Sequence, residues 1–116
     1  MKSLGCKGED LAITFLKAKG YTIIARNYKT PIGEIDIIAK DGRTIVFIEV
    51  KTRRSNSFGL PFESVTKRKR QKLQKLALLF LKKQEVEFPV RFDVVSIVYT
   101  DNGKKEIEHI PDAFEM

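Results

Sequence analysis

Residues 33–51 contain two apolar segments that are joined by Asp41-Gly42, and acidic side chains lie inside both segments. An Asp-Gly pair between two such segments is a strong signal for a two-residue β-hairpin turn. We therefore expect one strand over about residues 34–40 and a second over residues 44–52. A carboxylate inside a buried strand is unfavourable unless it is paired, holds a cation or takes part in chemistry. This hairpin therefore constrains both the fold and the function of the chain.

A turn at Asp41-Gly42 sets the register of the two strands. It places Glu34 opposite Glu49 and Asp36 diagonal to Glu49, and diagonal neighbours are about 7–8 Å apart. Because side chains alternate along a strand, Lys51 lies on the same face as these carboxylates. The other face takes the apolar side chains Ile35, Ile37, Val46, Ile48 and Val50.

Three carboxylates on one patch are expected to resist joint ionisation, and a divalent cation would relieve that repulsion. Oxygen ligands favour Mg²⁺ or Mn²⁺, and Mg²⁺ takes only a few carboxylates from protein while it keeps several waters. The simpler alternative is that Glu49 and Lys51 lie at a strand end and pair with each other or with solvent. Asp36 lies on the neighbouring apolar strand and on the same face as Glu49, and this favours a catalytic site.

Basic residues are concentrated in one part of the chain. Residues 51–75 contain nine Lys or Arg and one acidic residue, Glu63, whereas the whole chain has a formal net charge of +7. Such a block indicates a polyanionic partner, with nucleic acid first and an acidic membrane surface second. The alternative is a solubilising surface.

Apolar periodicity and turn residues predict seven elements. We expect helices over residues 7–19 and 64–84 and strands over residues 21–29, 34–40, 44–52, 91–100 and 106–110. Residues 53–62 are expected to form a loop, and residues 111–116 a helical turn. The crossover helix between the third and fourth strands should make these two strands parallel. The prediction is an α/β sandwich with helices flanking a central sheet.

The length of 116 residues predicts one domain over residues 1–116. The single cysteine, Cys6, allows no intramolecular disulfide and no thiolate zinc site. The absence of a long apolar run and of a signal-peptide core predicts a cytoplasmic protein without a membrane span. The only histidine, His109, disfavours a histidine-based nuclease site and is expected at the surface of a short edge strand. Asp93 is expected to accept structural hydrogen bonds from Arg91 or from a turn.

Asp36 followed by Glu49-Val50-Lys51 resembles the PD-(D/E)xK pattern of Mg²⁺-dependent nucleases, although Ile35 stands where that pattern has proline. Glu9 on a preceding helix resembles the arrangement of archaeal Holliday-junction resolvases. Several separated blocks are similar to the YraN-like family, which is uncharacterised and predicted to be endonuclease-like. These blocks are residues 8–12, 26–28, 33–36, 47–53 and 91–95.

The resemblance implies a restriction-endonuclease-like fold, with an αβββαβ core and a central mixed sheet flanked by helices. It also implies that Asp36, Glu49 and Glu9 ligate Mg²⁺ or Mn²⁺. Lys51 would orient or deprotonate the attacking water, or stabilise the pentacovalent phosphate. Glu34 is either an auxiliary ligand or solvent-exposed, and Gln71 either reaches toward the metal-site face or is solvated.

The basic residues of the second helix lie in its first turns, where the helix dipole disfavours cations, and phosphate binding would compensate for this. The residues expected to contact nucleic acid are Arg53, Arg54, Lys67, Arg68, Lys69, Arg70 and Lys72.

The leading hypothesis is a metal-dependent endonuclease that hydrolyses phosphodiester bonds of DNA, with branched DNA as the substrate suggested by the resolvases. The alternative is a non-catalytic accessory protein that binds DNA or another nucleic acid. A third option, an adaptor for acidic membranes or proteins, explains the charge but not the carboxylates. The resolvases act as dimers, so a homodimer is an option, but the sequence identifies no self-complementary surface.

Overall fold

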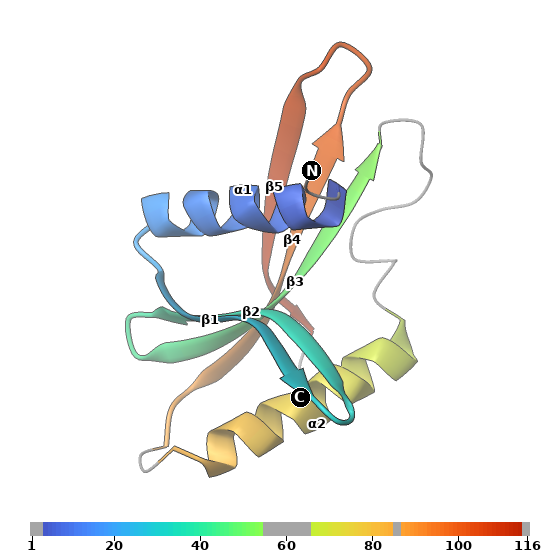
Figure 1. Ribbon diagram of the computed structural model, residues 1–116. Helices are drawn as coiled ribbons and strands as arrows, with labels where there is room; N and C mark the ends of the chain where they lie inside the picture. Colours follow the sequence, from blue (N-terminus) through green and yellow to red (C-terminus); the bar gives the residue numbers. More distant parts are fainter. Residues whose placement is uncertain (1–3, 55–65, 85–86, 115–116) are drawn as a thin grey trace.

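The computed structural model describes residues 4–54, 66–84 and 87–114 (Figure 1). Its elements are α1 (Leu4–Ala18), β1 (Thr22–Thr30), β2 (Gly33–Asp41), β3 (Thr44–Arg54), α2 (Lys67–Lys82), β4 (Val90–Tyr99) and β5 (Lys105–Phe114). The strands form one sheet in the order β1-β2-β3-β4-β5. β3 and β4 are parallel, and the other neighbouring strands are antiparallel. The predicted α/β fold with a mixed sheet and an αβββαβ core is confirmed.

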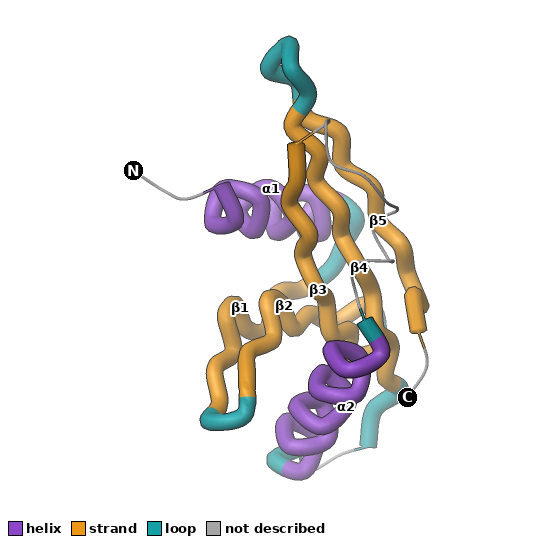
Figure 2. Tube along the Cα trace, turned by 90° about the vertical axis from the view of Figure 1, so that its right-hand side faces the viewer, coloured by secondary structure: helices purple, strands orange, loops and turns teal. Residues whose placement is uncertain are grey.

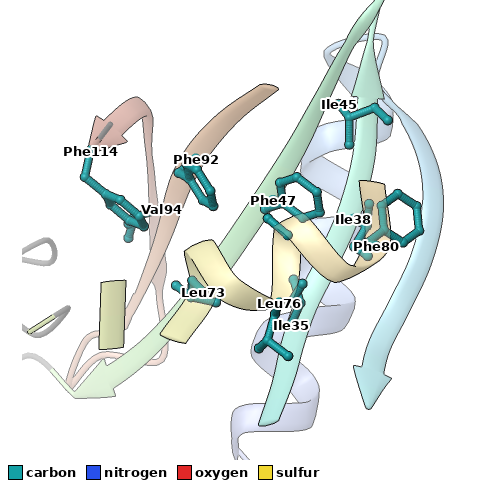
Figure 3. Packing of buried hydrophobic residues seen from close by; sticks show 11 residues of the cluster. Ile35, Ile38, Ile45, Phe47, Leu73, Leu76, Phe80, Phe92, Val94 and Phe114 are labelled. Carbon is teal, nitrogen blue, oxygen red and sulfur yellow. The ribbon is translucent and has the colours of Figure 1, made fainter. Parts of the chain in front are cut away.

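The two helices cover opposite faces of the sheet. Alternate residues of β3 accordingly belong to two different apolar clusters, one on each face. Phe47 packs in the cluster that contains the buried side chains of α2, whereas Ile48 packs in the cluster of α1. Figure 3 shows the first cluster, in which α2 contributes Leu73, Leu76 and Phe80. The α1 cluster includes Ala12 and Leu16, which are fully buried.

The first helix begins earlier than its sequence pattern predicts, at Leu4 rather than residue 7. Glu9 therefore lies beyond the first turn, where the helix dipole does not account for an acidic residue. The helix ends at Ala18, and Gly20 follows it with a φ of 95°, in the left-handed region. The amide of Tyr21 then donates to the carbonyl of Leu16 at 3.0 Å, which closes the helix end.

The hairpin between β2 and β3 forms as predicted, but its register differs by two residues from the expected one. Asp41 pairs with Thr44, so the turn residues are Gly42 and Arg43 rather than Asp41 and Gly42. Gly42 has a φ of 61°, and glycine at the first central position is typical of a type II′ turn. The pairing stops at Ile37 and Ile48. Continued by one step, this register would place Asp36 level with Glu49, not diagonal to it.

Beyond Ile37 the β1–β2 hairpin bends away from β3, as Figure 2 shows. Because of this bend, the prediction that Ile35 and Ile37 share one face is wrong. Ile35 packs in the α2 cluster, whereas Ile37 packs in the α1 cluster. β1 contains a register shift between Ile23 and Ala25, and Asn27 has a φ of 52°. Bulges and left-handed residues increase strand twist, and alternation along the sequence carries no sign of them.

Two strand ends also differ from the predictions. Arg53 and Arg54 continue β3 and pair with β4, whereas a loop was expected there. Residues 55–65, which contain the rest of that expected loop and the expected start of the second helix, lie outside the described residues. β5 extends to Phe114, so residues 111–114 form strand rather than a helical turn. The pairing of Phe92 with Phe114 and the stacking of their rings account for this extension.

Candidate active site

The structure places Asp36 and Glu49 where β2 separates from β3. Glu49 lies on the central strand β3 and is only 5% exposed. The carboxylate of Asp36 accepts a hydrogen bond from the backbone amide of Val50 at 2.9 Å. This bond replaces strand pairing at the point where the ladder ends, so it holds Asp36 beside β3.

Two ammonium groups converge on the buried carboxylate of Glu49. Nζ of Lys51 lies 3.4 Å from Oε1 of Glu49, and Nζ of Lys69 contacts the same oxygen. Lys51 is two residues further along β3, whereas Lys69 belongs to the first turn of α2. Thr66 caps this helix by accepting the amide of Lys69 at 3.2 Å, which fixes the backbone of Lys69.

Burial and neighbouring charges shift the pKa values of the site residues. Burial, followed by the charge of Glu49, raises the pKa of Asp36 to about 7, and Glu9 adds to the rise. Burial and the nearby ammonium of Lys69 lower the pKa of Lys51. Burial opposes the charged form of Lys69, but the hydrogen bonds to Glu49 and Lys51 and the charges of Glu49 and Asp36 together outweigh burial and raise the pKa of Lys69. The site therefore combines a carboxyl group and an amine that both ionise less readily than usual.

Glu9 approaches the site because α1 packs closely against the end of β3. A Cβ atom on Gly8 would lie 2.1 Å from Oγ1 of Thr52, so only glycine fits this contact. Oε1 of Glu9 lies 3.7 Å from Nε of Arg26, which also pairs with Asp10 at 2.5 Å. Glu9 thus acts on Asp36 through its charge, while its own carboxylate faces an arginine.

The chemistry of the donor set suits a hard divalent cation, although a complete ligand shell is not assembled. Within residues 4–54, 66–84 and 87–114, no three His, Cys, Asp or Glu side chains are grouped closely enough to hold a metal ion. Two carboxylates, Asp36 and Glu49, do lie together, and after burial the charge of Glu49 is the largest cause of the raised pKa of Asp36. Mg²⁺ commonly takes one or two carboxylates and fills its remaining positions with water. Glu9 as a third ligand stays a prediction.

The two auxiliary candidates lie away from Glu49. Glu34 is exposed and pairs across the sheet with Lys29, because the observed register removes it from Glu49. It lines a cavity of about 350 Å³ together with Thr66, Arg68, Lys69, Lys72, Leu73 and Leu76. Gln71 is exposed and lines a second cavity of about 300 Å³ with Ile32, Arg68, Lys72 and Lys75.

The basic residues expected to bind nucleic acid divide into separate groups. Arg68 and Lys72 line both cavities beside α2. Lys67 and Arg70 are exposed on the same helix, and Arg54 is exposed at the end of β3. Arg53 is partly buried beside it. Lys69 differs from all of these because it contacts Glu49.

The prediction that His109 lies at the surface is wrong. Its side chain is 2% exposed, and its ring accepts at Nδ1 from Lys19 at 2.8 Å and donates from Nε2 to Asp93 at 2.7 Å. Asp93 also accepts from Arg91 at 2.8 Å and from the amide of Asp112 at 2.9 Å. Asp93 therefore accepts structural hydrogen bonds, as expected, from Arg91 and from the backbone of Asp112, whose φ is 53°.

A family model for the uncharacterised protein family UPF0102 matches residues 8–97. The chain belongs to this family. A UPF0102 protein of Geotalea uraniireducens (strain Rf4) is 52% identical over 116 residues, which cover 99% of this chain and 91% of the relative. Those of Thermodesulfovibrio yellowstonii and Syntrophomonas wolfei are 55% and 50% identical, over 96% and 97% of this chain and 95% and 98% of the relatives.

The resemblance to the YraN-like family is thus confirmed at the level of the family. The UPF0102 match runs from α1 into β4, so it contains Glu9, Asp36, Glu49, Lys51 and Lys69. It does not extend to β5. Among the described residues, no helix is both long and apolar enough to cross a membrane.

Proposed function

We propose that this UPF0102 protein is a metal-dependent nuclease that hydrolyses phosphodiester bonds of DNA. The observation that carries the proposal is the pair Asp36 and Glu49, held side by side at a buried strand junction with Lys51 at 3.4 Å from Glu49. Burial, together with repulsion from Glu49, raises the pKa of Asp36 to about 7, and a divalent cation would offset the repulsion.

In this proposal Asp36 and Glu49 hold Mg²⁺ or Mn²⁺, and Glu9 supplies a further contact directly or through water. The cation would polarise a phosphoryl oxygen and make a bound water more acidic. Lys51 has a lowered pKa, so a larger fraction of its amine is neutral than in an ordinary lysine and is available to accept a proton from the attacking water. In its charged form Lys51 would instead offset the negative charge that develops on the phosphate.

The proposed substrate is DNA, and the basic surface of α2 supports this choice. Arg68, Lys72 and Lys75 are spaced about one turn apart and line adjoining cavities beside the β1–β2 hairpin. Residues spaced by three or four positions share one face of a helix. A row of cations on such a face can follow a phosphate backbone that leaves the scissile site, and phosphate contacts dominate non-specific affinity.

Replacing both Arg68 and Lys72 by alanine is expected to weaken DNA binding and flatten its salt dependence. Each lost phosphate contact should lower the slope of log affinity against log salt by about one. The matched control is Lys67→Ala with Arg70→Ala, which removes the same charge from exposed positions of the same helix. Fluorescence anisotropy with a labelled duplex across a salt series measures both slopes. Equal losses in the two double variants would show that only the net charge of α2 matters.

The function itself is tested with supercoiled, linear, single-stranded and four-way-junction DNA, each incubated with Mg²⁺, Mn²⁺ or EDTA. We expect cleavage with either metal and none with EDTA. Preferential cutting of the junction would support the branched substrate that the resemblance to resolvases suggests. DNA binding without cleavage under every condition would contradict the nuclease proposal and leave the non-catalytic binding protein in its place.

A further inference from the structure

We propose that Lys69 occupies the cation position on Glu49 in the metal-free protein and is displaced when a divalent cation binds. This inference rests on the proposed function and assigns a positioning role to a residue of α2. Its basis is the contact between Nζ of Lys69 and Oε1 of Glu49, a carboxylate whose side chain is 6% exposed. A buried carboxylate needs a positive partner, and Lys69 supplies one without a metal.

Glu49 has two ammonium partners on the same oxygen, and this crowding favours the release of one of them. Lys51 lies 3.4 Å from Oε1 and is tethered to the central strand two residues away. Lys69 belongs to the surface helix α2, and its side chain is 38% exposed. A divalent cation on Glu49 would repel both lysines, and Lys69 is the one with solvent and space beside it.

The side chain of Lys69 can leave Glu49 without movement of the helix. Thr66 caps α2 through the backbone amide of Lys69, so the main chain stays in place while the side chain rotates. Lys69 already lines the cavity of about 350 Å³ that Arg68 and Lys72 also line. The displaced ammonium therefore stays in a cavity that Lys69 already lines, together with the cations Arg68 and Lys72 and the carboxylate of Glu34.

This exchange makes cation binding and the positive charge of the cavity interdependent. A cation that enters at Glu49 delivers Lys69 to the cavity, where it can contact a phosphate next to the scissile bond. Conversely, a phosphate that attracts Lys69 into the cavity leaves Glu49 free for the cation. Linkage of this kind is reciprocal, so each ligand raises the affinity for the other by the same factor.

The test is isothermal titration of the full chain with MnCl₂, without DNA. Lys69→Met removes the competing ammonium, so its Mn²⁺ affinity should exceed that of the wild type roughly 3- to 10-fold. Lys67→Met is the matched control because it removes the same charge from an exposed position two residues earlier. Glu49→Gln should lose Mn²⁺ binding, and adding Lys69→Met to it should restore none.

Each outcome has a separate meaning. Tighter binding by Lys69→Met alone, with folding confirmed by circular dichroism, supports the exchange. Unchanged or weaker binding by Lys69→Met, or an equal gain in Lys67→Met, overturns it while the Glu49→Gln result still supports the metal site. Failure of the wild type and of Lys69→Met to bind Mn²⁺ at millimolar concentration would overturn both the exchange and the metal-dependent function.

Discussion

Asp36→Asn is expected to make the metal-free protein more stable and, at the same time, to impair the proposed nuclease activity. The pKa of Asp36 is raised to about 7 in the folded protein, mainly by burial and by Glu49. The folded state therefore keeps a proton that the unfolded state releases near pH 4, so the stability of the wild type falls as pH rises from about 4 to 7. Asparagine is neutral throughout and avoids this loss.

The gain should be about 1–3 kcal/mol at pH 8, below the ~4 kcal/mol that the full pKa difference would give. It should vanish near pH 4, where Asp36 of the wild type is protonated. Urea unfolding at both pH values, in EDTA, measures the difference. Glu106→Gln is the control because Glu106 is exposed on β5. A gain of equal size at pH 4 and pH 8 would contradict the electrostatic explanation.

The same substitution is expected to reduce the rate of DNA cleavage at least about 100-fold, because it removes one of two carboxylates proposed to hold the cation. DNA affinity without metal should change little, since Asp36 is not part of the basic surface. Single-turnover cleavage with Mg²⁺ and anisotropy in EDTA separate these two effects. Retention of wild-type cleavage by Asp36→Asn would remove Asp36 from the proposed mechanism.

Asp93→Asn is expected to cause the largest loss of stability, about 3–5 kcal/mol, without a direct effect on the proposed site. Asp93 is 1% exposed, and its carboxylate joins Arg91, His109 and the amide of Asp112. Removing one partner of a buried ionic network leaves the others unpaired in a medium of low dielectric constant. Urea unfolding at pH 7 measures the loss.

Asp41→Asn is the matched control, because Asp41 pairs with Arg91 as Asp93 does but lies at the surface. The side chain of Asp41 is 44% exposed and lies 3.2 Å from Arg91, so its removal should cost less than about 1 kcal/mol. If Asp41→Asn destabilised the protein as much as Asp93→Asn, the burial of Asp93 would not explain its contribution to stability.

The pH dependence gives a further signature of Asp93. Burial alone would raise its pKa, but hydrogen bonds from His109 and Arg91 outweigh burial and lower it. Its contribution is therefore fully present above about pH 4 and is lost as pH falls further. Asp93→Asn should remove that part of the acid sensitivity of the wild type.

Much of the fold follows from local patterns in the sequence. The apolar periodicity of the second helix predicted that Leu73, Leu76, Ala77, Phe80 and Leu81 share its apolar face. The first four are buried, and Leu81 is partly buried against the same cluster. The turn residues located the β2–β3 hairpin, and the long connection after β3 predicted the parallel β4. Alternation predicted that Asp36 and Glu49 lie together, and a register change of two residues preserves this prediction, although the bend in β2 breaks the alternation for Ile35. These features depend on residues close together in the chain.

The features that could not be predicted depend on tertiary contacts. Gly42 can form a two-residue turn with either Asp41 or Arg43, and only packing decides between the two resulting registers. His109 was misplaced because its partners, Lys19 and Asp93, are distant in sequence. Lys69 resembled its basic neighbours, since the sequence does not give the rotation of α2 relative to β3. The one signal in the sequence was the presence of cations, Lys69 among them, in the first turn of α2, where the helix dipole disfavours positive charge.

The strand order has a consequence for how the site is completed during synthesis. Because β1 to β5 are neighbours in chain order, a growing chain can build α1 and the β1–β3 meander from its first half. That half already carries Glu9, Asp36 and Glu49, whereas Lys69 and the parallel partner strand β4 are made later. A meander formed at that stage would hold its acidic residues together with Lys51 but without Lys69. Arrival of α2 supplies it, so the site matures only when the second half of the chain docks.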